Sequence, residues 1–304
     1  MKFDRTIKCV VAMAATVILS NAGALAATTP AAAPGPAEVP MPTGADMAKP
    51  TAEIKSGDPA QVDLALKQIY VWVDGGRPVR NVWVEWVPDL MKAGRNQEAA
   101  ALALEECIQR PAPEAIVPTM ELRVNALLAL NQTTDALAAA KQYYNVCDMK
   151  LTGGAVALVG QCLARAHPED ADITRRFRGE QVAASTLAAA AAVSASPDQA
   201  GTTQPSGILS AVVLDEKPWD DAIKTWSTKT EAVDRVGYGN ILLVVDRGAD
   251  AEKVFRDLYQ HAATPADKTV AAEGIAKSLR TEDGNLSRAN AWLIEYQKQS
   301  AAKP

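Results

Sequence analysis

The chain has few of the residues that usually carry enzyme or metal chemistry. Its 304 residues include only two histidines and four cysteines. No Cys-x-x-Cys pair or Cys/His cluster occurs, and the His-Glu-x-x-His, Gly-x-Ser-x-Gly and phosphate-loop motifs are absent. His167 and His261 each follow the expected end of a helix, where packing is the simplest interpretation. We therefore expect no metal site and no cofactor.

An excess of positive charge is also lacking. The chain carries 31 lysines and arginines against 36 aspartates and glutamates, which gives a formal net charge of −5 at pH 7. The phosphates of nucleic acids require a basic surface. The sequence therefore predicts no nucleic-acid partner. Charge alone selects neither a protein partner nor an oligomeric state.

Long apolar runs are absent after residue 26. The apolar stretch Cys9–Leu19 is shorter than the roughly 20 residues that a membrane-spanning helix needs. Basic residues precede it, and the small-residue motif Ala24-Leu25-Ala26 follows. This order is typical of a secretory signal peptide, so residues 1–26 are predicted to be cleaved. We expect an exported protein, periplasmic or extracellular, without a membrane span after cleavage.

Composition divides the remaining chain into four segments. Residues 27–56 are rich in proline and alanine and are predicted to form a disordered tether. Residues 57–186 carry apolar side chains at helical spacing, as do residues 207–300. Residues 187–206 have the composition of an Ala/Ser/Pro linker. The pattern predicts an N-terminal and a C-terminal helical block.

Three cysteines remain after the predicted cleavage, an odd number for an oxidising compartment. Any two of Cys107, Cys147 and Cys162 can pair, or all three can be buried as small apolar residues. Cys147 ends one expected helix and Cys162 lies about nine residues into the next. That position corresponds to a rise of roughly 13 Å, beyond the roughly 7 Å limit for a disulfide. The pairing stays open.

Aromatic side chains gather on the first two expected helices. Tyr70, Trp72, Trp83 and Trp86 fall within one short stretch. Tryptophan and tyrosine are enriched at binding hot spots, and the same residues also close the core of a terminal helical pair. Both interpretations stay open. The candidate binding residues are Trp83 and Trp86.

A turn residue followed by an alanine five positions later recurs along the chain. Glycine and asparagine tolerate the positive φ that such a turn requires, and alanine lets the two helices approach closely. The landmarks are Gly94 with Ala99, Asn131 with Ala136, and Gly284 with Ala289, while Gly248 marks a further turn with Ala251 only three positions on.

The spacing of these landmarks indicates a repeat. Gly94 precedes Asn131 by 37 positions, and Gly248 precedes Gly284 by 36. A two-helix unit at this period marks a helical solenoid. The residues resemble the tetratricopeptide-repeat family, whose unit has glycine at the turn, alanine five positions later and proline near its end. The stretch from Gly94 to Pro111 matches all three, although alanine or leucine replaces the usual aromatic residue after the alanine.

The resemblance implies an all-α fold of antiparallel helix-hairpin repeats in the two blocks. Stacked hairpins form a concave face, and such faces hold extended peptides or helices. A non-catalytic scaffold or adaptor is therefore implied, one that mediates protein-protein interaction in the cell envelope and binds a protein or peptide there.

Three alternatives stay open. Apolar, β-branched runs at 208–214 and 241–245 are also compatible with a small α/β unit at 207–263. An enzyme of hydrolase type would have to build its site near the acidic cluster at 215–221. A purely structural spacer would have no usable groove and no partner.

Overall fold

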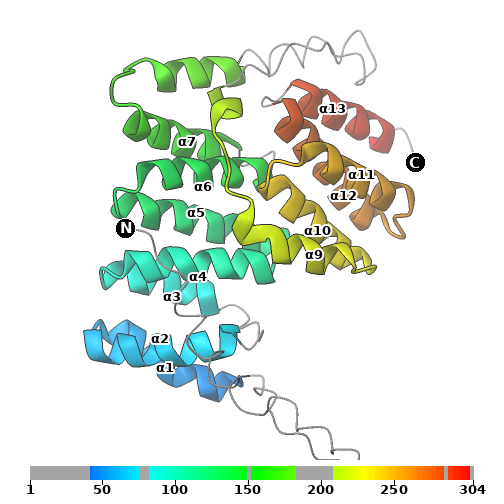
Figure 1. The fold of residues 1–304 in the computed structure, drawn as a ribbon. Coiled ribbons are helices and arrows are strands. Elements are labelled where there is room, and N and C mark those ends of the chain that lie inside the picture. The colour runs from blue at the N-terminus through cyan, green and yellow to red at the C-terminus, as the bar shows by residue number, and fades with distance from the viewer. Residues whose placement is uncertain (1–41, 75–81, 149–151, 183–207, 284–286, 302–304) are drawn as a thin grey trace, which may run out of the picture. The chain divides into compact units, whose positions relative to one another are not determined.

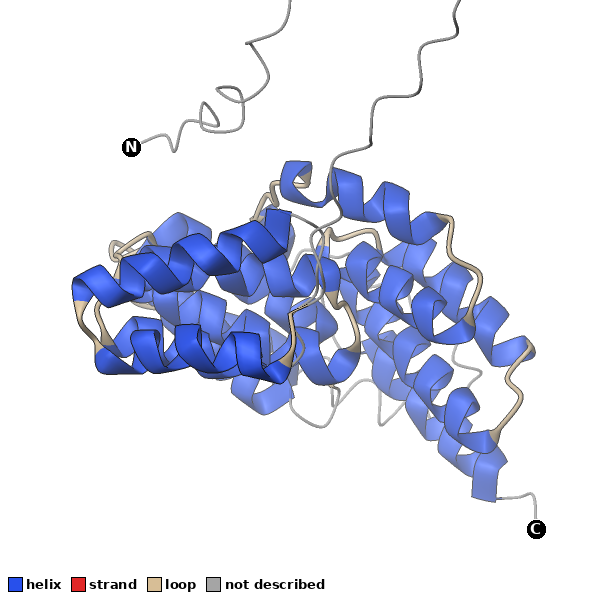
Figure 2. Cartoon of the chain, turned by 90° about the horizontal axis from the view of Figure 1, so that it is seen from below, coloured by secondary structure: helices blue, strands red, loops and turns tan. Residues whose placement is uncertain are grey.

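The computed structural model describes residues 42–74, 82–148, 152–182, 208–283 and 287–301. All regular structure in these ranges is helical and none is strand, so the predicted all-α class is confirmed (Figures 1 and 2). Residues 173–182 are helical, and short 3₁₀ turns cover Ile208–Ala211 and Lys217–Trp219. The α-helices are α1 (Gly44–Ser56), α2 (Pro59–Asp74), α3 (Val82–Lys92), α4 (Asn96–Gln109), α5 (Pro113–Ala129), α6 (Thr133–Val146), α7 (Thr152–Ala166), α9 (Asp220–Ser227), α10 (Ala232–Val244), α11 (Gly248–Gln260), α12 (Pro265–Asp283) and α13 (Ser287–Ala301).

Helix α1 lies within the segment predicted to be a tether, residues 27–56, and corrects that prediction. The helix begins at a capping box, in which Asp46 N–H donates to Thr43 Oγ1 and the Thr43 N–H donates to Asp46 Oδ2 at 2.7 Å. Pro50 and Ile54 are buried against the rest of the protein. Tertiary packing and a cap therefore order a stretch whose composition alone favours disorder. The predicted signal peptide and the predicted linker lie outside the described residues.

Consecutive helices pack as neighbours from α1 to α7 and again from α9 to α13. Helix α6 also contacts α10 and α12, so the first and second groups of helices share an interface (Figure 1). Small side chains occupy the contact faces: Ala99, Ala103, Ala136 and Ala140 have no exposed surface. Alanine at these positions lets helix axes approach closely, as the sequence predicted.

Three turns between helices share one backbone conformation. Gly94, Asn131 and Asp246 adopt positive φ values of 75°, 55° and 65°. The third residue corrects the predicted landmark, because Gly248 is the first residue of α11 and the turn is made by Asp246. Ala251 then lies five positions after the turn residue and is fully buried, as Ala99 and Ala136 are. Gly284 lies outside the described residues.

The alternative of a small α/β unit is wrong. Residues 241–244 belong to α10, and residues 208–211 form a 3₁₀ turn. The apolar run of α10 is continuous because α6, α11 and α12 cover the helix from several sides, and the five residues 241–245 are all buried. A helix covered in this way loses its polar face and resembles a buried strand in sequence. None of the described helices has both the length and the apolar character needed to cross a membrane.

A buried polar network joins α6 to α10 and α12. Lys141 Nζ donates to Asp246 Oδ2 at 2.6 Å and to the Val212 carbonyl at 3.1 Å. Arg280 is fully buried, and its Nη2 donates to the carbonyl oxygens of Asn145 and Cys147, both at 2.9 Å. These carbonyls lie at the C-terminal end of α6, where a cation also complements the helix dipole.

Candidate functional site

Of the two tryptophans predicted as binding residues, the structure places one in the core. Trp86 has no exposed surface, and its Nε1 donates to Thr51 Oγ1 at 2.8 Å. That hydrogen bond links α3 to α1. The side chain of Trp83 lies outside the described residues. Trp86 is therefore not accessible to a partner in this conformation.

The acidic cluster at 215–221 is not assembled into a catalytic arrangement. Its carboxylates are exposed, and Asp215 Oδ1 accepts a hydrogen bond from the Lys217 N–H at 3.1 Å. Asp220 and Asp221 occupy the first turn of α9, where carboxylates stabilise the helix dipole. In the part of the chain that the structure describes, no three His, Cys, Asp or Glu side chains are placed to hold a metal ion.

The cysteines are buried free thiols. Cys107, Cys147 and Cys162 form no disulfide and have no exposed surface. Burial raises the pKa of the Cys162 thiol to about 11 and that of Cys107 still further. The thiolate is the nucleophilic form, so neither of these thiols is activated for attack. Packing accounts for all three.

A groove of about 660 Å³ lies between α1 and α2. Such a volume is typical of sites that hold a ligand or a few side chains. Trp72 forms its nearly buried floor, and Leu64 exposes 57% of its surface along one wall. The lining residues are Pro42, Thr43, Ala45, Asp46, Lys49, Pro50 and Glu53 on the α1 side, and Leu64, Gln68 and Trp72 on α2.

The rim of this groove carries charges of both signs. Hydrogen bonds from the hydroxyl and the backbone N–H of Thr43 lower the pKa of Asp46, so its carboxylate is ionised at neutral pH. Lys49 Nζ lies 3.8 Å from Glu53 Oε1. The apolar walls and the mixed rim suit contact with a protein surface rather than chemistry.

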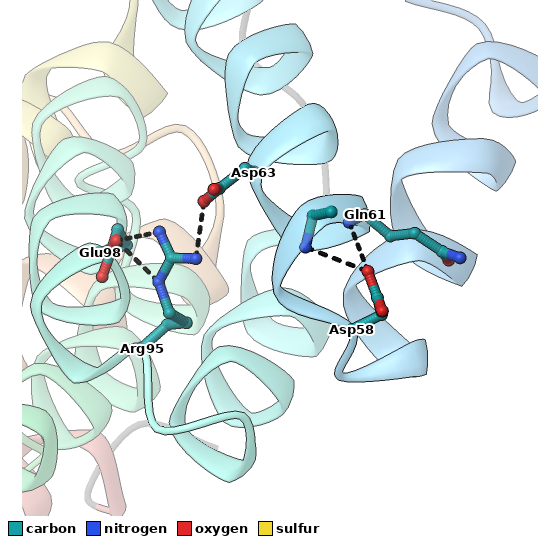
Figure 3. A network of polar contacts seen from close by, with 6 residues as sticks. Asp58, Gln61, Asp63, Arg95 and Glu98 are labelled. Carbon is teal, nitrogen blue, oxygen red and sulfur yellow. Dashed lines mark hydrogen bonds and ion pairs between the residues drawn. The ribbon is translucent and has the colours of Figure 1, made fainter.

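An arginine fixes the position of α2 beside α4 (Figure 3). Arg95, which follows the turn residue Gly94, donates through Nη1 to Asp63 Oδ1 on α2 at 2.7 Å. Its Nε donates to Glu98 Oε1 on α4 at 2.8 Å, and its Nη2 contacts the same oxygen. These two carboxylates raise the pKa of Arg95, which stays charged. The exposed face of α2 is therefore held in a defined orientation.

A second candidate surface is formed by aromatic rings on α11 and α13. Tyr259 packs edge-on against Trp292 and Tyr296, with ring centroids 5.8 Å and 6.1 Å apart. Trp292 Nε1 donates to the Ala272 carbonyl at 3.0 Å, and the Tyr296 hydroxyl lies 2.9 Å from Thr269 Oγ1. All three rings are partly exposed. Both α13 rings are thereby fixed against α12.

Two cations lie over these rings. Arg256 Cζ is 5.2 Å from the centre of the Trp292 ring, and Lys268 Nζ is 4.6 Å from the centre of the Tyr259 ring. Arg256 also pairs with Glu252 at 2.6 Å, whereas Lys268 forms no ion pair with a described residue. We refer to Arg256, Tyr259, Lys268, Trp292 and Tyr296 as the aromatic surface.

The sequence analysis did not single out the aromatic surface. Trp292 and Tyr296 are four residues apart, and this spacing puts them on one face of a helix. That signal was available. The approach of Tyr259 was not, because it depends on how α11, α12 and α13 pack together. Compared with family models, curated proteins and solved structures, the chain matches none of them.

Proposed function

We propose that the protein is an exported, non-catalytic scaffold that binds a partner protein through the aromatic surface. Tryptophan, tyrosine and arginine are the residues most enriched at binding hot spots. Here they lie together, partly exposed and fixed by hydrogen bonds and ring contacts. Side chains that are already held in place lose little entropy on binding. This surface is the observation that best supports the function.

We further propose that the helical pairs are tetratricopeptide-like repeats. Support comes from the turns: a residue with positive φ is followed five positions later by a buried alanine at Ala99, Ala136 and Ala251. The first and third turns also share an arginine that binds an acid three residues later, Arg95 with Glu98 and Arg247 with Asp250. A repeated unit of this kind is typical of scaffolds that present side chains from successive helices.

The test compares three variants on one background. The full chain, Tyr296→Ala, Lys268→Glu and the control Lys224→Glu are immobilised and exposed to envelope extract of the source cells. Lys224 is exposed on α9, away from the aromatic residues in sequence. We expect a stoichiometric partner to be retained by the wild type and the control, and reduced at least tenfold by the other two. Equal retention by all four proteins would contradict the proposed function.

A further inference from the structure

Exposed large apolar side chains are concentrated on helix α2. Leu64 exposes 57%, Val71 53% and Tyr70 36% of its surface, all within eight residues. The other such residues, on the elements that the structure describes, are single valines at positions 182, 213, 233 and 270. Isolated exposed apolar residues are normal, whereas a contiguous group marks an interaction surface.

Leu64 and Val71 share one face of α2. Residues seven positions apart lie about 20° apart around a helix and about 10 Å apart along it. Leu64 also lines the groove between α1 and α2, together with Gln68 and the floor residue Trp72. The exposed stripe and the groove therefore form one continuous surface, which we call the α1/α2 face.

The α1/α2 face is unusual for the first pair in a row of helices. Terminal helical pairs of stacked-helix proteins normally carry a polar outer side, because no further helix covers them. Among the described helices, α2 packs chiefly on α1, and α1 packs on α2 and α3 (Figure 1). The outer side of this pair nevertheless presents leucine, valine and a groove over tryptophan. A further layer of helices would bury them.

The charges beside the apolar stripe select the kind of partner. Asp46 and Glu53 are acidic, Lys49 and Lys67 are basic, and the four side chains sum to no net charge. A two-fold symmetric interface places one patch against its own copy. A patch with net charge would repel itself, but a balanced patch can pair each carboxylate with an ammonium of the other copy.

The dimensions also suit a pair of copies. Helix α2 has 16 residues and is about 24 Å long, and two neighbouring helices are about 20 Å wide. That footprint, before side-chain relief is counted, is of the order that a modest protein-protein interface requires on each partner.

We propose that the α1/α2 face binds a second copy of this chain, so that two α1/α2 pairs close against each other about a two-fold axis. Helix α2 of each copy lies along the groove of its partner copy, and the two Leu64–Val71 stripes pack together. This association does not depend on the aromatic surface. It would place two aromatic surfaces in one particle, and linked binding sites raise the apparent affinity for a clustered partner.

Sedimentation velocity of the full chain between about 1 and 100 µM tests the proposal. We expect the wild type to sediment as a dimer in the upper part of this range. Leu64→Glu and Val71→Glu would bring like charges into the apolar stripe and should sediment as monomers. Val233→Glu, at a valine that exposes 68% of its surface on α10, is the matched control and should stay dimeric.

A wild type that remains monomeric at 100 µM would overturn the proposal and leave the α1/α2 face to a different protein. Retained dimerisation by both glutamate variants would place the interface elsewhere. Should either variant lose its helical circular dichroism, Gln68→Cys gives an independent readout. Gln68 lies between Leu64 and Val71, so two copies should form a disulfide on mild oxidation, whereas Thr225→Cys on α9 should not. Equal crosslinking by both would also overturn the proposal.

Discussion

Lys141 Nζ lies 2.6 Å from Asp246 Oδ2, and this ion pair joins two helices that are more than a hundred residues apart in the chain. Lys141 is almost fully buried, whereas Asp246 is partly exposed. Asp246 also accepts a hydrogen bond from Asn145 Nδ2 at 3.2 Å and makes the turn between α10 and α11 with φ 65°. One residue therefore shapes a turn and holds α6.

Removing this carboxylate should cost the protein about 3 kcal/mol of unfolding free energy. Asp246→Ala leaves the buried ammonium of Lys141 without its counter-charge and puts alanine in a left-handed conformation. Asp246→Asn should cost clearly less, because asparagine tolerates this conformation and its carbonyl still accepts from Lys141. Urea unfolding followed by circular dichroism measures both. Equal losses for the two variants would show that the ion pair contributes little.

Glu106 should make the protein less stable as the pH rises toward neutral. Its side chain is buried on α4 with Arg110 Nη1 3.0 Å from Oε1, and burial raises the pKa of Glu106 to about 7. In the unfolded chain the same carboxyl titrates near its ordinary value of about 4.5. The folded state therefore holds a proton that the unfolded state has lost, and the stabilisation present below about pH 4.5 is lost as the pH rises through about 7.

This effect is measured by comparing the wild type with Glu106→Gln. A neutral glutamine cannot titrate, so the difference in unfolding free energy between the two proteins isolates Glu106. We expect the wild type to lose up to about 3 kcal/mol relative to the variant between pH 4.5 and pH 7.5. A difference that is constant across this range would show that Glu106 has an ordinary pKa.

The thiols of Cys107, Cys147 and Cys162 should be inert in the folded protein. All three are fully buried, and burial disfavours the reactive thiolate at the first and last of these residues. An aromatic disulfide reagent at pH 8 should modify none of them natively and all of them in urea. Rapid reaction of any one without denaturant would reveal an opening of the surrounding helices.

Phe255 should make Gly274 intolerant of substitution. A Cβ atom at Gly274 would overlap the Phe255 ring, which is itself almost fully buried. Gly274→Ala should therefore lower the unfolding free energy by about 1–3 kcal/mol through overpacking. The matched control is Gly154→Ala in α7, where a Cβ meets open space and the better helix propensity of alanine should be neutral or stabilising. If both variants unfold alike in urea, the ring has room to move.

The helical class and two turns could be predicted because their signals are local. Gly94 and Asn131 occupy turns with positive φ, and apolar periodicity marks most helices. Asp246 was missed because Gly248 stands two residues later and glycine is the stronger signal for such a turn. Helix α1 was missed although Thr43 and Asp46 have capping-box spacing, because the prolines around them favour an irregular chain.

The candidate surfaces depend on tertiary packing and could be predicted only in part. Trp86 was a reasonable binding candidate by residue type, but whether a tryptophan faces the core depends on which helices cover it. The meeting of Tyr259 with Trp292 requires α11 and α13 to pack on α12. Neither fact follows from the spacing of residues along one helix.

The contacts of α6 also set an order on synthesis. Lys141 waits for Asp246, 105 residues later, and the carbonyl oxygen of Asn145 waits for Arg280, 135 residues later. Until α10 and α12 have emerged, the first helices carry an uncovered ammonium and open carbonyls at the end of α6. The N-terminal half is therefore not complete when its own last residue is made, and a chain truncated before α12 should be degraded rather than accumulate as a stable fragment.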